Sequence, residues 1–245
     1  MSEILANMSV VLGADISEFR SAMASAKAEL KGLVQFGEGM KDIGQQMTLG
    51  LTLPLALAGF AAVKAYDEAA KGVAAIENGI RSTGGAAKVT SEQLLALAAA
   101  QQKKSVYQDD EIINKVSQQL LTFSNITGQT FARTQQAAID LSSKLGQDLQ
   151  TSAIQLGKAL NDPTQSLGAL RRAGISFSNE QIAVIHHLQA TNQLGQAQTI
   201  ILNELERQYG GTAEAAAKAG TGPMKQLANQ FNDLQESIGK IILTA

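Results

Sequence analysis

The side chains that could carry chemistry are few and stand in small groups. His186 and His187 are the only histidines. As neighbours on a helix they point about 100° apart, so they cannot easily face one metal ion. Asp109, Asp110 and Glu111 could bind a cation, but the helix dipole favours three acids in a first helical turn. We therefore expect solvated or interface histidines and a helix start at these positions.

No motif supports a catalytic site. The chain has no Gly-rich phosphate loop, no nucleophile elbow and no His-Glu-x-x-His zinc motif. Glycoside hydrolysis needs two carboxylates roughly 5 to 9 Å apart, and no acidic pair stands in a recognisable frame. The densest basic spots, Lys103-Lys104 and Arg171-Arg172, fit the cation preference of helix carboxyl termini better than phosphate contact. The sequence predicts no catalytic residue, no cofactor and no metal.

The elements that position these side chains are predicted to be helices, so the fold class is mainly α. Of the 245 residues, 44% are hydrophobic but only 4% are aromatic, with no Trp and three Pro. Such a core of Ala, Leu, Ile and Val suits close-packed helices, and alternating β-branched runs are absent. The formal net charge of −2 argues against specific nucleic-acid binding, which needs a concentrated basic surface. Without cysteines, disulfides and thiolate metal sites are excluded.

Apolar residues at alternating three- and four-residue spacing predict coiled-coil helices at both ends of the chain. Residues 1–42 hold a short extended segment and the first helix, and residues 212–245 hold a flexible link and the start of the second. The seam residues are Ile16, Phe19, Met23, Leu30 and Leu33, then Leu227, Phe231, Leu234 and Ile238. We expect self-association as a trimer or another small multiple; the alternative is a surface helix packed on its own domain. The second helix reaches Ala245 without a stop signal, which suggests a truncated chain.

Residues 43–64 form an apolar segment in which Ile43–Val63 carry no charge. As one helix this run would span roughly 31 Å, close to the thickness of the bilayer hydrocarbon. Pro54 would kink such a helix, so a core helix or a protected hairpin is at least as good an interpretation as a membrane span. The residues expected to insert into a membrane are Leu49, Leu51, Leu53, Leu55, Leu57 and Phe60.

Residues 65–211 read as a compact domain of short capped helices. Thr90 with Gln93 and Ser178 with Gln181 are predicted capping boxes. Asp162-Pro163 predicts an N-cap followed by proline at the first helical position, and Gly174 after two arginines predicts a helix end. We expect a core that includes Phe123, Leu156, Leu170 and Ile185.

Five short phrases in this domain carry a family resemblance. They are Ser82–Ala87 (STGGAA), Leu120–Ile126 (LLTFSNI), Leu156–Pro163 (LGKALNDP), Leu170–Ser178 (LRRAGISFS) and Tyr209–Gly211 (YGG). In this order and spacing, within residues 64–245, they resemble the amino-terminal region of the tail length tape measure proteins of long-tailed bacteriophages and prophages.

The resemblance implies a structural protein of the virion, not an enzyme. Copies would lie in the tail lumen, with tube subunits polymerising around them so that helix length sets tail length, and would leave ahead of the DNA and aid its passage through the envelope. The implied partners are the tail tube protein, tail assembly chaperones, tail tip or baseplate proteins and the host membrane. The implied locations are the host cytoplasm during assembly, the tail lumen, and the host envelope on infection. Two alternatives stay open: a membrane-active, pore-forming helical toxin and a peptidoglycan hydrolase.

Overall fold

The computed structural model describes residues 52–244, with side chains from Gly59 onward, and these residues are mainly α-helical with no strand among them. The chain divides into two compact units. One is Lys71–Gln226, called here the helical domain. The described part of the other consists of residues 59–70 and 227–244, together with the backbone of 52–58.

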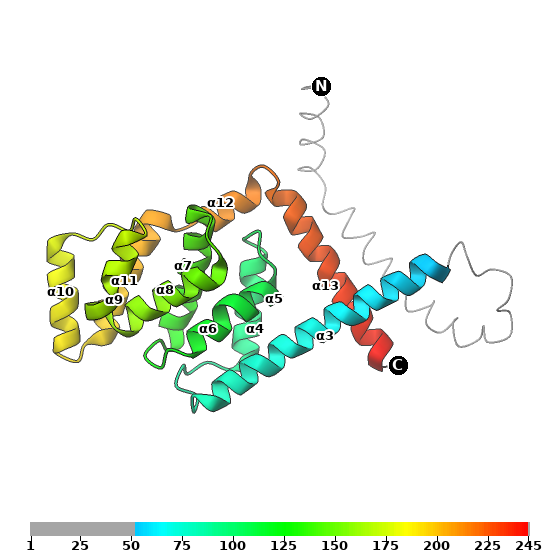
Figure 1. Ribbon diagram of the computed structural model, residues 1–245, viewed down its shortest axis with the longest axis horizontal. Coiled ribbons are helices and arrows are strands. Elements are labelled where there is room, and N and C mark those ends of the chain that lie inside the picture. The colour runs from blue at the N-terminus through cyan, green and yellow to red at the C-terminus, as the bar shows by residue number, and fades with distance from the viewer. Residues whose placement is uncertain (1–51, 245) are drawn as a thin grey trace, which may run out of the picture. The chain divides into compact units, whose positions relative to one another are not determined.

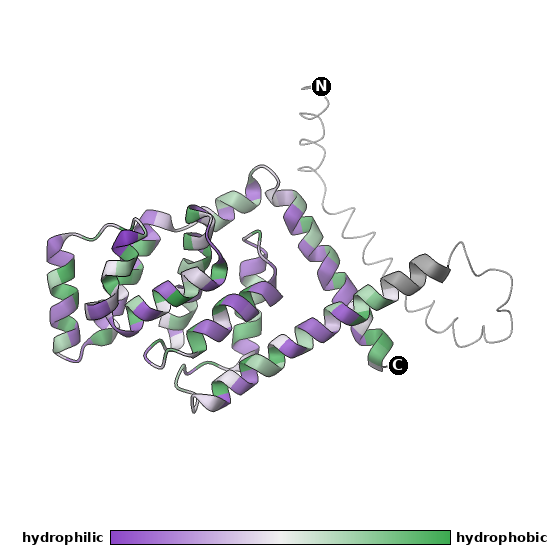
Figure 2. Ribbon diagram, in the orientation of Figure 1, coloured by the Kyte–Doolittle hydropathy of each residue, from purple (hydrophilic) through white to green (hydrophobic). Residues whose placement is uncertain are grey.

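The helices follow one another through short connections (Figure 1). Their order is α3 (Thr52–Ser82), α4 (Ser91–Gln102), α5 (Asp109–Ile112), the π-helical turn η1 (Ile113–Ser117), α6 (Gln118–Leu121), α7 (Gly128–Leu145), α8 (Leu149–Asn161), α9 (Pro163–Arg172), α10 (Asn179–Ala190), α11 (Leu194–Tyr209), α12 (Thr212–Lys218) and α13 (Gly222–Thr244). Helix α7 is the centre of the domain, since α8, α11 and α12 all pack against it. The domain's helices carry both hydrophobic and hydrophilic residues, as amphipathic helices around one core do (Figure 2).

Local signals set the helix ends as predicted. The two capping boxes are confirmed: Thr90 pairs with Gln93 at the start of α4, and Ser178 pairs with Gln181 at the start of α10. Asp162 caps α9 through the backbone N–H of Gln165, with proline following it. Each cap gives partners to N–H groups that the helix itself leaves unpaired.

The core contains three of the four residues predicted for it. Leu156, Leu170 and Ile185 are fully buried, whereas Phe123 is only partly buried and packs against the edge of the core. Phe123 lies in the loop after α6, and its ring rests on Gly157 of α8: a methyl group on Gly157 would lie 2.1 Å from Phe123 Cε2. The prediction that Phe123 is a core residue is therefore wrong to the extent that the ring lies at the edge of the core, where it packs on Gly157 of α8.

Two further expectations differ from the structure. The stretch expected as a flexible link forms α12, and Ala213 and Ala217 of this helix are buried. Pro54 is the third residue of α3 as described, and the residues before Thr52 lie outside the described chain, so the predicted kink stays a prediction. Because α3 runs on to Ser82, the predicted boundary between residues 64 and 65 falls inside this helix.

The second unit holds a close helix crossing. A methyl group on Gly239 of α13 would lie 2.0 Å from the carbonyl oxygen of Ala62 on α3 and 3.0 Å from Cβ of Tyr66. Ala62 is buried, so the two backbones touch where both side chains are minimal. The outgoing helix α13 therefore has a partner in its own chain.

Candidate functional site

The groups first considered for chemistry lie apart from one another. His186 and His187 are exposed on α10, and the acids from Asp109 to Glu111 form the first turn of the short helix α5. Arg171 and Arg172 occupy the last turn of α9 and are exposed, as the helix dipole predicts. Within residues 52–244 no three His, Cys, Asp or Glu side chains are grouped closely enough to hold a metal ion.

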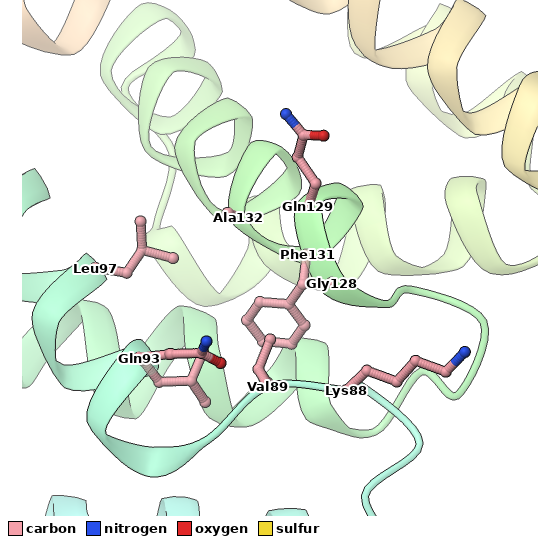
Figure 3. Close-up of a pocket in the computed structure, with 9 residues that line it drawn as sticks. Lys88, Val89, Gln93, Leu97, Gly128, Gln129, Phe131 and Ala132 are labelled. Atoms are coloured by element: carbon pink, nitrogen blue, oxygen red, sulfur yellow. The ribbon is translucent and has the colours of Figure 1, made fainter.

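A surface pocket of about 350 Å³ lies between the loop before α4, helix α4 and the start of α7 (Figure 3). Its base is apolar, with the buried Leu94 and the ring of Phe131. Lys88 carries the one charge in the lining, and its side chain extends away from the Phe131 ring. The lining holds no acid, histidine or hydroxyl group.

The joint between α9 and α10 is fastened from α11 by two adjacent side chains. Gln208 donates from Nε2 to the carbonyl of Ser176 (2.7 Å) and accepts at Oε1 from the N–H of the same residue (3.0 Å). The hydroxyl of Tyr209 donates to the carbonyl of Gly174 at 3.0 Å. Gly174 has a φ of +98°, a backbone conformation that residues with a side chain rarely adopt. A methyl group on Gly174 would lie 3.6 Å from the Tyr209 hydroxyl oxygen. The phrases LRRAGISFS and YGG thus form one contact.

A buried carboxylate stands beside this joint. Glu204 of α11 is 6% exposed and accepts hydrogen bonds from Arg207, from Gln181 Nε2 at 3.0 Å and from Gln208 Nε2. The Arg207 guanidinium, helped by the two amides, lowers the pKa of Glu204 from 4.5 to about 2 despite the opposing effect of burial. The ionised side chain links α11 to Gln181, the residue that completes the capping box of α10.

The joint between α6 and α8 uses amide side chains in the same way. Asn125 donates from its backbone N–H to Asn161 Oδ1 and from Nδ2 to the carbonyl of Asn161, both at 3.3 Å. The buried Gln198 of α11 donates to the carbonyls of Asn125 (2.8 Å) and Leu160 (3.0 Å). The phrases LLTFSNI and LGKALNDP meet at this joint, because the Phe123 ring also rests on Gly157.

Helix α12 is capped by a buried acid that no sequence pattern singles out. Asp140 of α7, 4% exposed, accepts at Oδ1 from the N–H of Ala213 in the first turn of α12 (2.9 Å). Gly211, which precedes α12, has no side chain to cap it, so Asp140 supplies the cap from 73 residues away. A local search for capping residues cannot find such a contact.

The predicted seam and membrane residues are only partly within the described chain. Ile16, Phe19, Met23, Leu30, Leu33, Leu49 and Leu51 lie outside the described residues; Leu53, Leu55 and Leu57 lie on α3 in the part whose side chains are not described. Phe60 is 75% exposed on α3. Among residues 52–244, we find no helix that combines the length and the apolar composition of a membrane span.

On α13 the predicted seam lies along one side of the helix. Leu227, Leu234 and Ile238 are half-buried, while Phe231 is 49% exposed. Met224, one heptad before Phe231, is 52% exposed, and Ile242 is 40% exposed. We call these six residues the α13 stripe. Gly239, the α13 residue that meets α3, directly follows Ile238 of the stripe.

The joints describe a mainly α-helical protein in which side chains of one helix hold the ends of other helices. The family described as "Prophage tail length tape measure protein" matches residues 30–186. This chain belongs to that family, so the predicted family is confirmed. The family is structural, and its members determine the length of phage tails. Searches of curated proteins and of solved structures return no match.

Proposed function

We propose that copies of this chain associate through the α13 stripe and lie in the tail lumen, where they act as the spacer around which the tail tube assembles. The observation that carries the proposal is the stripe itself: two large apolar residues one heptad apart, Met224 and Phe231, are each about half exposed. Apolar side chains at heptad spacing are covered when helices wind together into a coiled coil. A trimer or another small multiple would bury them.

In this proposal the length of the helical spacer determines the length of the tail tube. The 23 residues of α13 span roughly 35 Å at about 1.5 Å per residue. A coil that continues at this rise converts residue number directly into tube length. The tail tube protein, the assembly chaperones and the tip or baseplate proteins are the partners that such a spacer would contact.

The measuring role is tested in the prophage that encodes the chain. An in-phase insertion of four heptads after Leu234 should lengthen tails by roughly 42 Å in electron micrographs. The control places an insertion of equal length at Asn192, an exposed turn residue between α10 and α11, and should leave tail length unchanged. Unchanged tails in the Leu234 variant would contradict the measuring role.

Self-association is tested on the purified chain by light scattering. Met224→Asp with Phe231→Asp should reduce the mass of the assembly, because a coil would bury both charges. Lys240→Asp, at an exposed position of α13 away from the stripe, is the matched control. Leu30→Asp with Leu33→Asp tests the first predicted seam in the same assay. A chain that is monomeric at high concentration before any substitution would refute the association.

We also propose that the chain leaves the tail ahead of the DNA and that its apolar segment, Ile43–Val63, then contacts the host envelope. What supports this is the absence of charge over 21 residues and the exposure of Phe60 on the described part of the segment. A peptide of residues 41–66 should bind liposomes, and Leu53→Asp with Leu57→Asp should abolish binding, since a charge at mid-bilayer costs about 3 kcal/mol. A peptide that stays in the aqueous phase at every lipid concentration would show that the segment is core.

A further inference from the structure

Helix α3 is seated on the domain by two glycines that are seven residues apart. A methyl group on Gly72 would lie 3.3 Å from Ile113 Cγ2, and one on Gly79 would lie 3.0 Å from Leu121 Cδ1. The residues that face these glycines are eight positions apart along the helix formed by α5, η1 and α6. Seven residues on one helix are therefore matched by eight on the other.

The π-turn accounts for the extra residue. On a regular α-helix, residues seven apart share a face because two turns take about 7.2 residues. In η1 the N–H of Gln118 donates to the carbonyl of Ile113, an i to i+5 bond, so this turn takes up one more residue than an α-turn. Without it, Leu120 and not Leu121 would face Gly79. Both residues are leucines, so either register presents the same side chain to α3.

A buried hydrogen-bonded chain distinguishes the two registers. Ser117, the last residue of η1, donates from Oγ to Gln135 Oε1 of α7 at 3.0 Å, and Gln135 Nε2 donates to Gln101 Oε1 of α4 at 2.8 Å. All three residues are buried. An α-helical register would move Ser117 away from Gln135 and leave the buried amide without this donor, which is unfavourable.

We propose that the Ser117–Gln135–Gln101 chain holds this helix in its π register and that a second, α-helical register, with Leu120 against Gly79, is available to the folded protein. Because the next loop carries Phe123 to its contact with Gly157, a change of register also moves that joint. The contact of α3 at Gly79 and the contact of Phe123 with Gly157 on α8 are then coupled, because both change when this helix changes its register. This inference does not depend on the proposed function.

The two registers can be trapped by disulfides, because the chain contains no cysteine. The Cβ positions of residues 79 and 121 are 3.7 Å apart, within the range of about 3.5 to 4.5 Å that a disulfide requires. The pair Gly79→Cys with Leu121→Cys reports the π register. The change at Leu121 also removes the Cδ1 atom that a side chain at position 79 would approach most closely. Gly79→Cys with Leu120→Cys reports the α register. The full chain is oxidised in glutathione buffer, and the cross-linked fraction is read on a non-reducing gel.

In the parent background the Leu121→Cys pair should form readily and the Leu120→Cys pair only slightly. Adding Ser117→Ala should raise the Leu120→Cys cross-link relative to the Leu121→Cys cross-link by about tenfold, which corresponds to about 1.4 kcal/mol, the scale of one lost buried hydrogen bond. Ser152→Ala, a buried serine on α8 outside this hydrogen-bonded chain, is the matched control and should leave the ratio unchanged. The same rise in both alanine variants would overturn the assignment to Ser117.

A deletion gives a second readout. Removing Asn114, an exposed residue of η1, places Leu121 seven residues from Ile113 in a regular α-helix. The Leu121→Cys pair should then still form, and the Leu120→Cys pair should stay suppressed even with Ser117→Ala. If the Leu120→Cys pair never forms in the Ser117→Ala chain, or forms equally well after the deletion, the two-register proposal is wrong.

Discussion

The contact between Gly157 and the Phe123 ring leads to a prediction about the mutation Gly157→Ala. We expect this mutation to destabilise the chain when the Phe123 ring is present and to stabilise it when the ring is absent. A methyl group on Gly157 would lie 2.1 Å, 2.4 Å and 2.7 Å from three atoms of the ring, so Gly157→Ala must displace it. Because the closest approach is only 2.1 Å, we expect an overpacking cost in the upper part of the usual range, about 2 to 3 kcal/mol, while alanine in place of glycine inside a helix gains about 1 kcal/mol. We expect Gly157→Ala to lower the free energy of unfolding by about 1 to 2 kcal/mol.

Removing the ring should remove the conflict. Phe123→Ala alone should cost about 2 kcal/mol, less than the 3 to 5 kcal/mol of a fully buried phenylalanine, because the ring is only partly buried. In the Phe123→Ala background, Gly157→Ala should stabilise the chain by about 1 kcal/mol, since only the helix propensity remains. The coupling between the two sites is then about 2 to 3 kcal/mol, in the range measured for residues in contact.

Urea unfolding followed by far-ultraviolet circular dichroism measures all four members of this cycle. Gly195→Ala is the control, because a methyl group on Gly195 of α11 would meet no atom within 4 Å; it should be neutral or slightly stabilising whether or not Phe123 is present. Equal destabilisation by Gly157→Ala with and without the ring would refute this contact.

Three further predictions concern the domain. Asp140→Ala should cost about 1 to 2 kcal/mol and speed hydrogen exchange at Ala213, because α12 loses its cap; unchanged exchange would contradict the remote cap. Glu204, whose pKa is lowered to about 2 by Arg207, stabilises the fold above pH 4.5, and this contribution is lost as pH falls from about 4.5 towards 2. Glu204→Gln should remove that part of the acid dependence, as measured by thermal melts at several pH values. If the melting temperature of the variant falls with pH as steeply as that of the parent chain, this role of Glu204 is refuted. Residues 71–226 alone should give a helical spectrum and one cooperative transition, whereas a disordered spectrum would show that the unit needs the rest of the chain.

The sequence predicted well wherever the cause of a feature is local. The capping boxes at Thr90 and Ser178 depend on two residues three positions apart, so the pattern alone identifies them. The burial of Leu156 and Leu170 follows from apolar spacing on amphipathic helices. Helical class follows from a composition poor in aromatics and in β-branched alternation.

The features that were missed have causes far away in the chain. The stretch that forms α12 is rich in Ala and Gly and reads as a link, but Asp140 caps it and α7 covers its buried alanines. Phe123 looks like a core residue until its contact with Gly157 is known. The π-turn η1 has no sequence pattern of its own: its i to i+5 hydrogen bond, and the two glycines of α3 that match its extra residue, are visible only in the folded chain.

The contacts at the helix joints meet one recurring physical need. Backbone groups at helix ends lack intrahelical partners and must be satisfied from elsewhere. Here long amides, an aspartate and a tyrosine supply the partners: Gln198 for two carbonyls, Gln208 for both groups of Ser176, Asp140 for Ala213, and Tyr209 for Gly174. An amide suits this role because it carries both a donor and an acceptor without a charge to bury. Gln198, Gln208 and Asp140 therefore have a structural role at these positions, which is to join helices that are far apart in the sequence.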